Sequence, residues 1–374
     1  MSKIFLVVRD SRYFLSHRLS LALALKERGH ALHIYCAVRD DQDSKALAKH
    51  GLLVTHIPLL GEGFVGKRAL ESLKVLYEGM RRERPDTIFA VTVLANLLTG
   101  ILCRWFKVRH IVLVAGVGTL YRTEGLRYRL LRIVSNALYR FALKKPQTKV
   151  IFQNANDRSI FLENGLCREA DTLLIPGSGV DLTAFPYRPY ELSPQRARRV
   201  GMVARMLRDK GVVEFVEAAK HLKRKHQEVE FVLVGGVDKA NPTSLSPEEL
   251  EGLLHTEDVQ WLNHRSDIPE ILAGFDIFCL PSYHEGLPKA MLEAAAAGCS
   301  LVVTDIPGCR AFVENDVNGM LVPVKDASAL ASAIEELLEK PEMAARLAKA
   351  AYGKVESGFS QEKVLGLYLG VFEG

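Results

Sequence analysis

The 374-residue sequence is poor in cysteine patterns that bind metals or form disulfides. Its six cysteines include no C-x-x-C pair, and several lie inside apolar runs. Zinc sites and disulfide frameworks normally show regular cysteine spacing. We therefore expect no zinc site and reduced core cysteines, as in a cytoplasmic protein, at Cys36, Cys103, Cys167, Cys279, Cys299 and Cys309.

Long apolar segments are also scarce. The first ten residues hold only about five apolar residues before a charge, too few for a signal peptide. The longest uncharged stretch, from Thr87 to Cys103, is at the lower length limit for crossing a bilayer, and it contains Thr92, Asn96 and Thr99. A buried strand followed by a helix is the better interpretation, so no membrane-spanning segment is expected.

What the sequence does contain is typical of a folded globular protein. Hydrophobic residues make up 48% and charged residues 25%, which excludes disorder, collagen and coiled coil as the dominant state. At roughly 100–200 residues per domain, the length favours two domains and allows three.

The net charge of +5 hides a strong polarity. Residues 1–150 contain 26 Lys and Arg against 11 Asp and Glu, whereas residues 151–374 contain 23 against 33. An anionic partner is therefore expected at the first half. The most basic stretch runs from Tyr121 to Lys149, where only Glu124 opposes Arg122, Arg127, Arg129, Arg132, Arg140, Lys144, Lys145 and Lys149.

This basic stretch also contains Leu, Ile, Val, Tyr and Phe, so two interpretations stay open. It is either a surface that lies on anionic lipid or a solvated basic helix. Nucleic acid is a poorer explanation because no recognised binding motif accompanies the charge.

Short β-branched runs alternate with stretches of helical period, which predicts α/β architecture with parallel sheets. We expect a helix near Leu15–Arg28, ended by Gly29, and a linker from Pro176 to Pro194, after which the pattern restarts. The domains predicted are 1–180, 195–360 and a C-terminal helix over 361–374 that packs back toward the N-terminal domain. Strands are expected near Ile4–Val8, Leu32–Cys36, Thr87–Val91, His110–Val114, Val150–Gln153, Val200–Ala204, Phe231–Val234, Phe275–Leu280 and Leu301–Thr304.

The segment from Tyr283 to Gly298 is typical of a strand-to-helix turn that binds an anion. Pro288 suits the first helical position and Gly298 suits the residue after the helix end. Glu285 precedes the helix and Glu293 lies within it, about 12 Å away if all eight steps were helical. Two such carboxylates could hold opposite ends of a polyhydroxylated ligand, or Glu293 could be an ordinary helix residue; spacing alone leaves both open.

Cationic residues follow another predicted strand. Arg205 and Lys210 project from the turn after Val200–Ala204, where Arg offers bidentate contacts to phosphate and Lys a mobile charge. A solvated turn is the alternative. Gly235-Gly236, directly after Phe231–Val234, allows close approach of a phosphate to the backbone or simply forms a turn.

Taken together, these residues resemble family 4 of the retaining glycosyltransferases, which have the GT-B fold. The resemblance covers roughly Arg199 to Val324 and includes Glu285-x7-Glu293 and Pro307-Gly308-Cys309-Arg310, followed by Glu314 and Asn318-Gly319. In the first half of the chain the resemblance is weaker, and it depends on Ser16-His17-Arg18-Leu19 and Lys26–His30. The motif sequences are most similar to those of bacterial members that elongate lipid-diphosphate-linked oligosaccharides.

The resemblance implies two Rossmann-like doubly wound domains facing a central cleft, and it implies roles for individual residues. Arg205 and Lys210 would bind the donor diphosphate, and Glu285, Gly286 and Leu287 the donor sugar. Glu293 would hold the ribose, and Arg265, in the loop Asn263-His264-Arg265, would lie where the family places the nucleobase. The donor would be a UDP-sugar, with no cofactor and no metal.

The function expected on this basis is retaining transfer of a hexose or N-acetylhexosamine to a lipid-linked saccharide at the inner face of the cytoplasmic membrane. A donor phosphate oxygen would take the acceptor proton, so no protein base is needed. Two alternatives remain: a nucleotide-sugar epimerase of the same fold, and a non-enzymatic glycan- or lipid-binding module.

The first half departs from the family pattern. Ala115-Gly116-Val117-Gly118 stands where many members carry a His, and Arg9–Tyr13 replaces a glycine-rich loop, so no catalytic His is assigned. His17 and Arg18 are candidates for holding an acceptor phosphate, with helix capping or a structural role as the alternative. Asp41-Gln42-Asp43 matches a metal motif of the other glycosyltransferase fold, but solvated loop and helix capping is the favoured interpretation.

Overall fold

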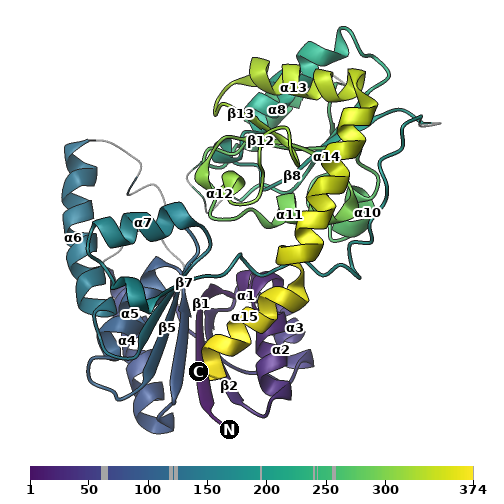
Figure 1. Ribbon diagram of the computed structural model, residues 1–374. Coiled ribbons are helices and arrows are strands. Elements are labelled where there is room, and N and C mark those ends of the chain that lie inside the picture. Colours follow the sequence, from purple (N-terminus) through teal and green to yellow (C-terminus); the bar gives the residue numbers. More distant parts are fainter. Residues whose placement is uncertain are drawn as a thin grey trace. The chain divides into compact units, whose positions relative to one another are not determined.

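The computed structural model describes residues 1–59, 66–117, 121, 125–193, 196–238, 241, 243–254 and 258–373. The chain divides into two compact units (Figure 1). Unit 1 comprises Met1–Ser178 and Leu365–Gly374, and unit 2 comprises Gly179–Val364. Each unit contains a parallel sheet with helices on both faces, which confirms the predicted α/β class.

The elements of unit 1 alternate between strand and helix as the sequence pattern predicts. In chain order they are β1 (Lys3–Asp10), α1 (Ser11–His17), α2 (Leu19–Glu27), β2 (Ala31–Ala37), α3 (Asp41–Lys49), β3 (Leu53–His56), α4 (Lys67–Glu83), β4 (Thr87–Val91), α5 (Val93–Leu102), β5 (Arg109–Val114), α6 (Leu126–Leu143), β6 (Thr148–Phe152), α7 (Ala155–Glu163), η2 (Glu169–Asp171), β7 (Thr172–Leu174) and the end of α15 (Gln361–Glu373).

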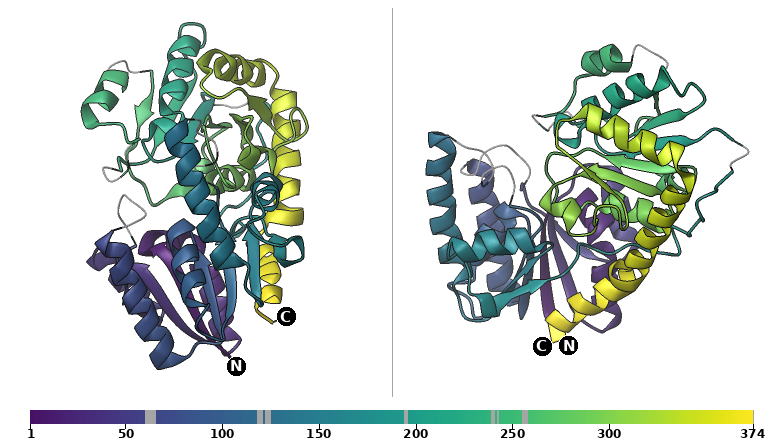
Figure 2. Two further views of the ribbon diagram at one scale, coloured as in Figure 1. Left: turned by 90° about the vertical axis from the view of Figure 1, so that its left-hand side faces the viewer. Right: turned by 45° about the horizontal axis from the view of Figure 1, so that its top comes forward.

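The sheet of unit 1 has the order β3-β2-β1-β4-β5-β6-β7, and every pair is parallel. Helices α1 to α3 lie on one face, and α4 to α6 lie on the other (Figures 1 and 2). The chain reverses its direction of winding between β1 and β4, so this is a doubly wound sheet. Its central strands are buried apolar runs, as parallel strands covered on both faces must be.

One predicted helix is broken in two. The helical pattern of Leu15–Arg28 is continuous, but Arg18 leaves the helical conformation with φ of −128° and separates α1 from α2. The predicted end is confirmed, because Gly29 takes a left-handed φ of +82°.

Unit 2 repeats the alternation with shorter strands. Its elements are β8 (Arg199–Val203), η3 (Arg208–Lys210), α8 (Val212–Lys223), β9 (Glu230–Val234), α9 (Pro247–Leu254), β10 (Gln260–Trp261), α10 (Ile268–Leu272), β11 (Ile277–Leu280), α11 (Lys289–Ala297), β12 (Ser300–Thr304), α12 (Pro307–Arg310), β13 (Met320–Val322), α13 (Ala327–Glu339), α14 (Pro341–Lys354) and η4 (Val355–Phe359).

The sheet of unit 2 has the order β10-β9-β8-β11-β12-β13, again with parallel pairs. One apolar core packs α8 and α13 against it, and a second core packs α10 and α11. The winding reverses between β8 and β11, and the carboxyl ends beside such a reversal are where doubly wound sheets bind ligands.

The stretch interpreted as a linker is part of unit 2 from Gly179 onward. Phe185 is buried in the core with α11, and the Arg188 amide donates to Ala297 O at 3.2 Å. The prolines therefore mark a segment without regular secondary structure, but this segment packs against the core of unit 2. Pro194 lies outside the described residues.

Three smaller expectations concern cysteines, helix ends and membrane spans. All six cysteines are buried and free of disulfides, as predicted. Helix α11 ends at Gly298 with φ of +92°, whereas Pro288 is its N-cap in an extended conformation and not its first helical residue. In the described part of the chain, no helix combines the length and apolarity needed to cross a bilayer.

Candidate active site

Lys210 and Glu285 meet at the carboxyl edge of the unit 2 sheet. Lys210 follows β8 and Glu285 follows β11, the two strands between which the winding reverses. The Lys210 Nζ donates to the Glu285 Oε1, and the side chains are 20% and 13% exposed. The structure thus brings together two residues that lie 75 positions apart, at the place where a doubly wound sheet binds its ligand.

Glycines allow the two loops to approach each other. Gly211 has a left-handed φ of +75°, and a Cβ there would lie 2.2 Å from Pro281 O. A Cβ on Gly308 would lie 2.4 Å from Glu285 O. Any other residue at either position would therefore push the loop of Glu285 away. This gives a physical reason for Pro307-Gly308 in the motif: the start of α12 supports the backbone that carries Glu285.

Arg205 does not contact Glu285 in the structure. Its guanidinium forms an ion pair with Asp238 at 2.7 Å, and Asp238 follows β9. The glycines before Asp238 are required for packing: Gly235 has φ of +144°, and a Cβ there would lie 1.7 Å from Ala204 O. The carbonyl of Gly236 accepts from the Met206 amide at 3.1 Å. The Gly-Gly pair thus joins the ends of β8 and β9.

Glu293 lies in α11 and is not an exposed helix residue. Its side chain is 12% exposed and pairs with Lys289 one turn earlier at 3.0 Å. Burial raises the pKa of the Glu293 carboxyl, and the Lys289 ammonium only partly opposes this. Because Glu285 lies in a loop before the helix, the 12 Å spacing assumed for a continuous helix does not apply.

The remaining donor-side candidates follow two strands of the same sheet: Arg265 comes after β10, and Gly286 and Leu287 come after β11. Arg265 is exposed beyond β10, and both its hydrogen bonds go to Asp267, which raises the pKa of the guanidinium. The side chain of Leu287 is buried in the core, so only its backbone is available to a ligand. Gly286 lies between Glu285 and Leu287, just before α11.

The two acceptor-side candidates are adjacent in the chain, but their side chains have different surroundings. His17 stacks on Tyr13 with ring centroids 4.6 Å apart and is only half-buried. Arg18 is 2% exposed, and its guanidinium donates to Tyr13 Oη at 3.3 Å and to Gly177 O at 3.5 Å, below the ring of Tyr368. These contacts favour the structural role considered as its alternative, and the acceptor role of Arg18 stays a prediction.

The Asp-x-Asp motif begins a helix. Asp40 caps α3 by accepting from the Asp43 amide, and Asp41 lies in the first turn. Asp43 itself is buried and accepts from the Ser11 hydroxyl at 2.5 Å. Helix capping is confirmed for this segment, although Asp43 is not solvated as predicted.

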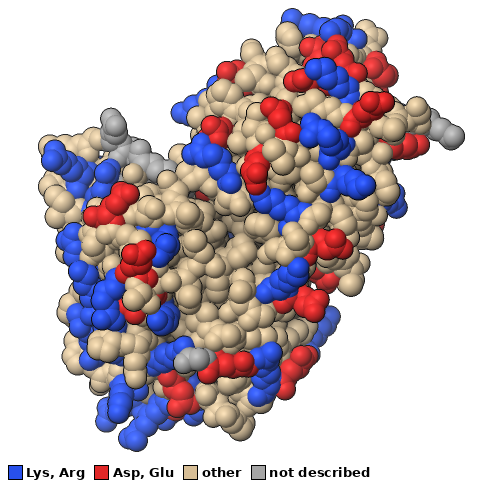
Figure 3. Space-filling model, viewed as in Figure 1, with Lys and Arg blue, Asp and Glu red and all other residues tan. Residues whose placement is uncertain are grey.

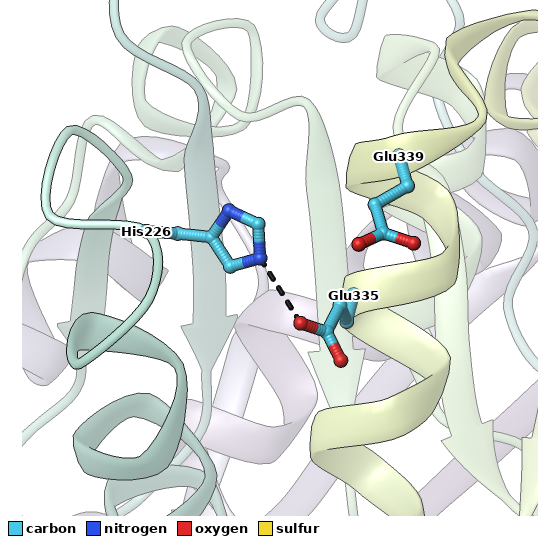
Figure 4. Close-up of side chains that lie close together, drawn as sticks. All are labelled: His226, Glu335 and Glu339. Atoms are coloured by element: carbon cyan, nitrogen blue, oxygen red, sulfur yellow. Dashed lines mark hydrogen bonds and ion pairs between the residues drawn. The ribbon is translucent and has the colours of Figure 1, made fainter.

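A different group of side chains has the composition of a metal site. His226, Glu335 and Glu339 place one ligand atom each within 4.8 Å of one another (Figure 4). However, the Lys225 ammonium lies 2.7 Å from Glu335 and 3.2 Å from Glu339. A cation of the protein itself thus already neutralises both carboxylates.

Two residues near the site were missed by the sequence analysis. Asp238, the partner of Arg205, gives no signal in the sequence, because acidic residues after strands are common. No role was predicted for Tyr283, the first residue of the segment from Tyr283 to Gly298. In the structure its amide donates to Asp209 O at 2.8 Å. The aromatic residue two positions before Glu285 was the available signal.

Two family models match the chain. The model for glycosyl transferases group 1 matches residues 186–354, and the model for glycosyl transferase 4-like proteins matches residues 3–154. A Campylobacter jejuni N,N'-diacetylbacillosaminyl-diphospho-undecaprenol alpha-1,3-N-acetylgalactosaminyltransferase is 32% identical over 90% of this chain and 92% of its own. An Escherichia coli UDP-Gal:alpha-D-GlcNAc-diphosphoundecaprenol alpha-1,3-galactosyltransferase is 26% identical over 84% and 82%.

Solved structures agree on the fold. Anabaena HepE in complex with UDP and glucose has a TM-score of 0.79 at 19% identity, covering 100% of both chains. WaaG, a glycosyltransferase involved in lipopolysaccharide biosynthesis, has a TM-score of 0.72 at 16% identity, covering 98% of this chain and 99% of its own. The motifs, the two doubly wound units and these matches lead to one conclusion: the chain belongs to the family 4 (group 1) glycosyltransferases of the GT-B fold.

Proposed function

We propose that this glycosyltransferase moves a hexose or N-acetylhexosamine from a UDP-sugar to a lipid-diphosphate-linked saccharide, with retention and without a metal. The observation that carries the proposal is the Lys210–Glu285 pair at the winding reversal of unit 2. The donor and acceptor classes are supported by the names of the two relatives, which act on undecaprenol-diphosphate-linked sugars. HepE, of the same fold, was solved with UDP and glucose.

The donor diphosphate would exchange places with carboxylates of the protein. In the structure Asp238 pairs with Arg205 and Glu285 pairs with Lys210. A diphosphate that binds both cations takes over these contacts, and the uncapped N-terminus of α11 adds backbone donors that favour an anion. Glu285 is then available to accept hydrogen bonds from sugar hydroxyls, and Glu293 from the ribose.

The reaction breaks the bond between the anomeric carbon and the donor phosphate oxygen. It forms a bond between that carbon and an acceptor hydroxyl oxygen. Negative charge grows on the departing UDP, and Arg205 and Lys210 stabilise it; one preorganised group of this kind contributes about 3–4 kcal/mol. The acceptor attacks from the face that UDP leaves, and its proton passes to a phosphate oxygen of UDP, which accounts for retention without a protein base or a metal.

Helix α6 supports attachment to the inner face of the cytoplasmic membrane. Its buried face carries Asn136, Tyr139, Ala142 and Leu143. Its opposite face is apolar as well, and five side chains exposed there follow helical spacing: Leu126, Leu130, Ile133, Val134 and Phe141. Leu131 of the same helix is exposed too. Of the predicted basic stretch, Arg122 and Glu124 lie outside the described residues, as does Gly118 before it.

Basic side chains flank this apolar stripe. Arg127, Arg129, Arg140 and Lys144 are exposed, and the helix sequence contains no Asp or Glu. Figure 3 shows Lys and Arg gathered along the left edge of the molecule, where Figure 1 shows α6. An apolar stripe with basic flanks is typical of a helix lying in an anionic lipid interface, where each basic residue contributes about 1 kcal/mol. Five large apolar side chains exposed on one stripe favour the lipid interface over the alternative of a solvated basic helix.

Turnover tests the proposed reaction. The purified protein is incubated with UDP-sugars and an undecaprenyl-diphosphate-linked saccharide, with EDTA present, and UDP release and the anomeric configuration of the product are measured. We expect acceptor-dependent UDP release, an α-linked product from an α-linked donor, and loss of both with Glu285→Gln. Isomerised donor without acceptor would instead support an epimerase, and binding without turnover would support a glycan-binding module.

Vesicle sedimentation tests the membrane proposal. We expect the protein to bind vesicles that contain anionic lipid and to release them as salt increases. Leu130→Ser with Ile133→Ser should reduce binding, whereas Leu70→Ser, at a leucine on α4 that is at least as exposed, should not. Equal binding by the α6 variant and the wild type would refute the role of this stripe.

A further inference from the structure

Tyr283 links the two loops that carry Lys210 and Glu285. It lies in the loop between β11 and α11, two residues before Glu285. Its amide donates to Asp209 O at 2.8 Å, in the turn of Lys210. Its hydroxyl donates to Glu214 Oε1 at 2.5 Å, in the first turn of α8, the helix that follows that turn. One residue therefore contacts the Lys210 segment through both its backbone and its side chain.

Glu214 is an unusual acceptor for this hydroxyl. It is 8% exposed, and its Oε2 is buried without a hydrogen-bond partner. Within the described residues, no Lys, Arg or His forms an ion pair with it. A carboxyl group that is removed from water in this way depends on the hydrogen bonds that remain, because a buried acceptor left without a donor carries its full desolvation cost.

The hydroxyl of Tyr283 also remains a donor over a wide pH range. Burial raises the pKa of Tyr283 well above its usual value, and the hydrogen bond to Glu214 raises it further. The Lys325 ammonium lies over the ring, 5.1 Å from the ring centroid.

We propose that Tyr283 and Glu214 are positioning residues that hold the Lys210 turn and the Glu285 loop in alignment when the donor diphosphate binds. The inference rests on the proposed donor site. The Lys210–Glu285 pair cannot provide this alignment, because the diphosphate competes for Lys210. The bonds of Tyr283 to Asp209 and Glu214 involve neither group, so they persist through the exchange.

Calorimetric titration with UDP, together with thermal unfolding, tests the inference on the full chain. We expect Tyr283→Phe to raise the Kd for UDP about tenfold. Glu214→Gln, whose amide oxygen can still accept from the hydroxyl, should stay within about threefold of the wild type. The matched control is Tyr190→Phe, which removes a buried hydroxyl that has no partner among the described residues; its Kd should equal that of the wild type.

A double variant separates alignment from simple destabilisation. Tyr283→Phe with Glu214→Leu removes the stranded carboxylate, so its midpoint of unfolding should recover, while the Kd should stay raised. Recovery of both would assign Tyr283 a merely structural role and overturn the inference, as would a Tyr283→Phe variant with the wild-type Kd. If the wild type itself binds no UDP, the donor site is wrong and the proposed function fails first.

Discussion

Replacement of Lys210 by methionine is the most informative single change in the proposed donor site. The substitution keeps much of the length of the side chain but removes its charge. Lys210 would stabilise the UDP that leaves, so its loss should lower kcat about 10²–10³-fold, equivalent to about 3–4 kcal/mol. The Km for the donor should rise as well, because the ammonium would contact the diphosphate in the ground state.

The same substitution has a predictable cost in stability. Removing one partner of a fully buried ion pair costs about 3–5 kcal/mol, and removing an exposed one costs about 0–1 kcal/mol. With Lys210 20% exposed and Glu285 13% exposed, we expect about 2 kcal/mol between these limits. The stability loss arises from the Glu285 carboxylate left without its cation, so Glu285→Gln in the same chain should restore it.

The two effects are separated by measuring thermal unfolding and acceptor-dependent UDP release for the same variants. The double variant should recover stability but not activity, because the charge that stabilises UDP is still missing. Lys225→Met is the matched control, since it removes an ion-paired lysine of unit 2 that has no place in the donor site. Wild-type kcat in Lys210→Met would refute the assignment of this residue.

Three further predictions concern other described residues. Arg18→Ala should lower the free energy of unfolding by about 3 kcal/mol through the cavity it leaves, and unchanged stability together with a raised acceptor Km would support Arg18 as an acceptor ligand. Because the pKa of Glu293 is raised above 4.5, UDP affinity should fall as the pH decreases through that raised value, and Glu293→Gln should flatten this dependence in titrations. The sign for stability is opposite, since a raised carboxyl pKa favours folding at low pH and this contribution is lost as the pH rises. Zinc should not raise the unfolding midpoint of the wild type, because Lys225 occupies the position between Glu335 and Glu339, but it should raise that of Lys225→Met.

The strands that form the centres of both sheets were predictable because they are continuous apolar runs. Thr87–Val91 was placed at its observed bounds, and the ends of the other central strands were placed within two residues of theirs. The short strands β3, β7, β10 and β13 were not predicted. All four lie at the edges of their sheets, and burial is incomplete in β3, β7 and β10, so their apolar signal is weaker.

Contacts between distant residues could not be predicted from local pattern. The break at Arg18 arises where its guanidinium reaches Gly177, 159 residues away. Nothing in the helical period of Leu15–Arg28 carries that information. For the same reason the sequence indicated Arg205, Lys210 and Glu285 by type and position but not their pairing, and it gave no role to Asp238.

The pairing of these groups changes how the donor site should be understood. A cradle of unpaired cations would attract any phosphate, whereas here Arg205 and Lys210 are already neutralised by Asp238 and Glu285. In the proposed donor site a diphosphate would have to displace both carboxylates, so its affinity would be the difference between two sets of ion pairs and not the sum of new ones. The displaced Glu285 gains a new partner only if a sugar hydroxyl is present to donate to it, since an unpaired, mostly buried carboxylate is costly. If the proposed site binds the donor, recognition of the diphosphate and of the sugar is coupled through Glu285, and this coupling would favour a complete nucleotide-sugar over free phosphate.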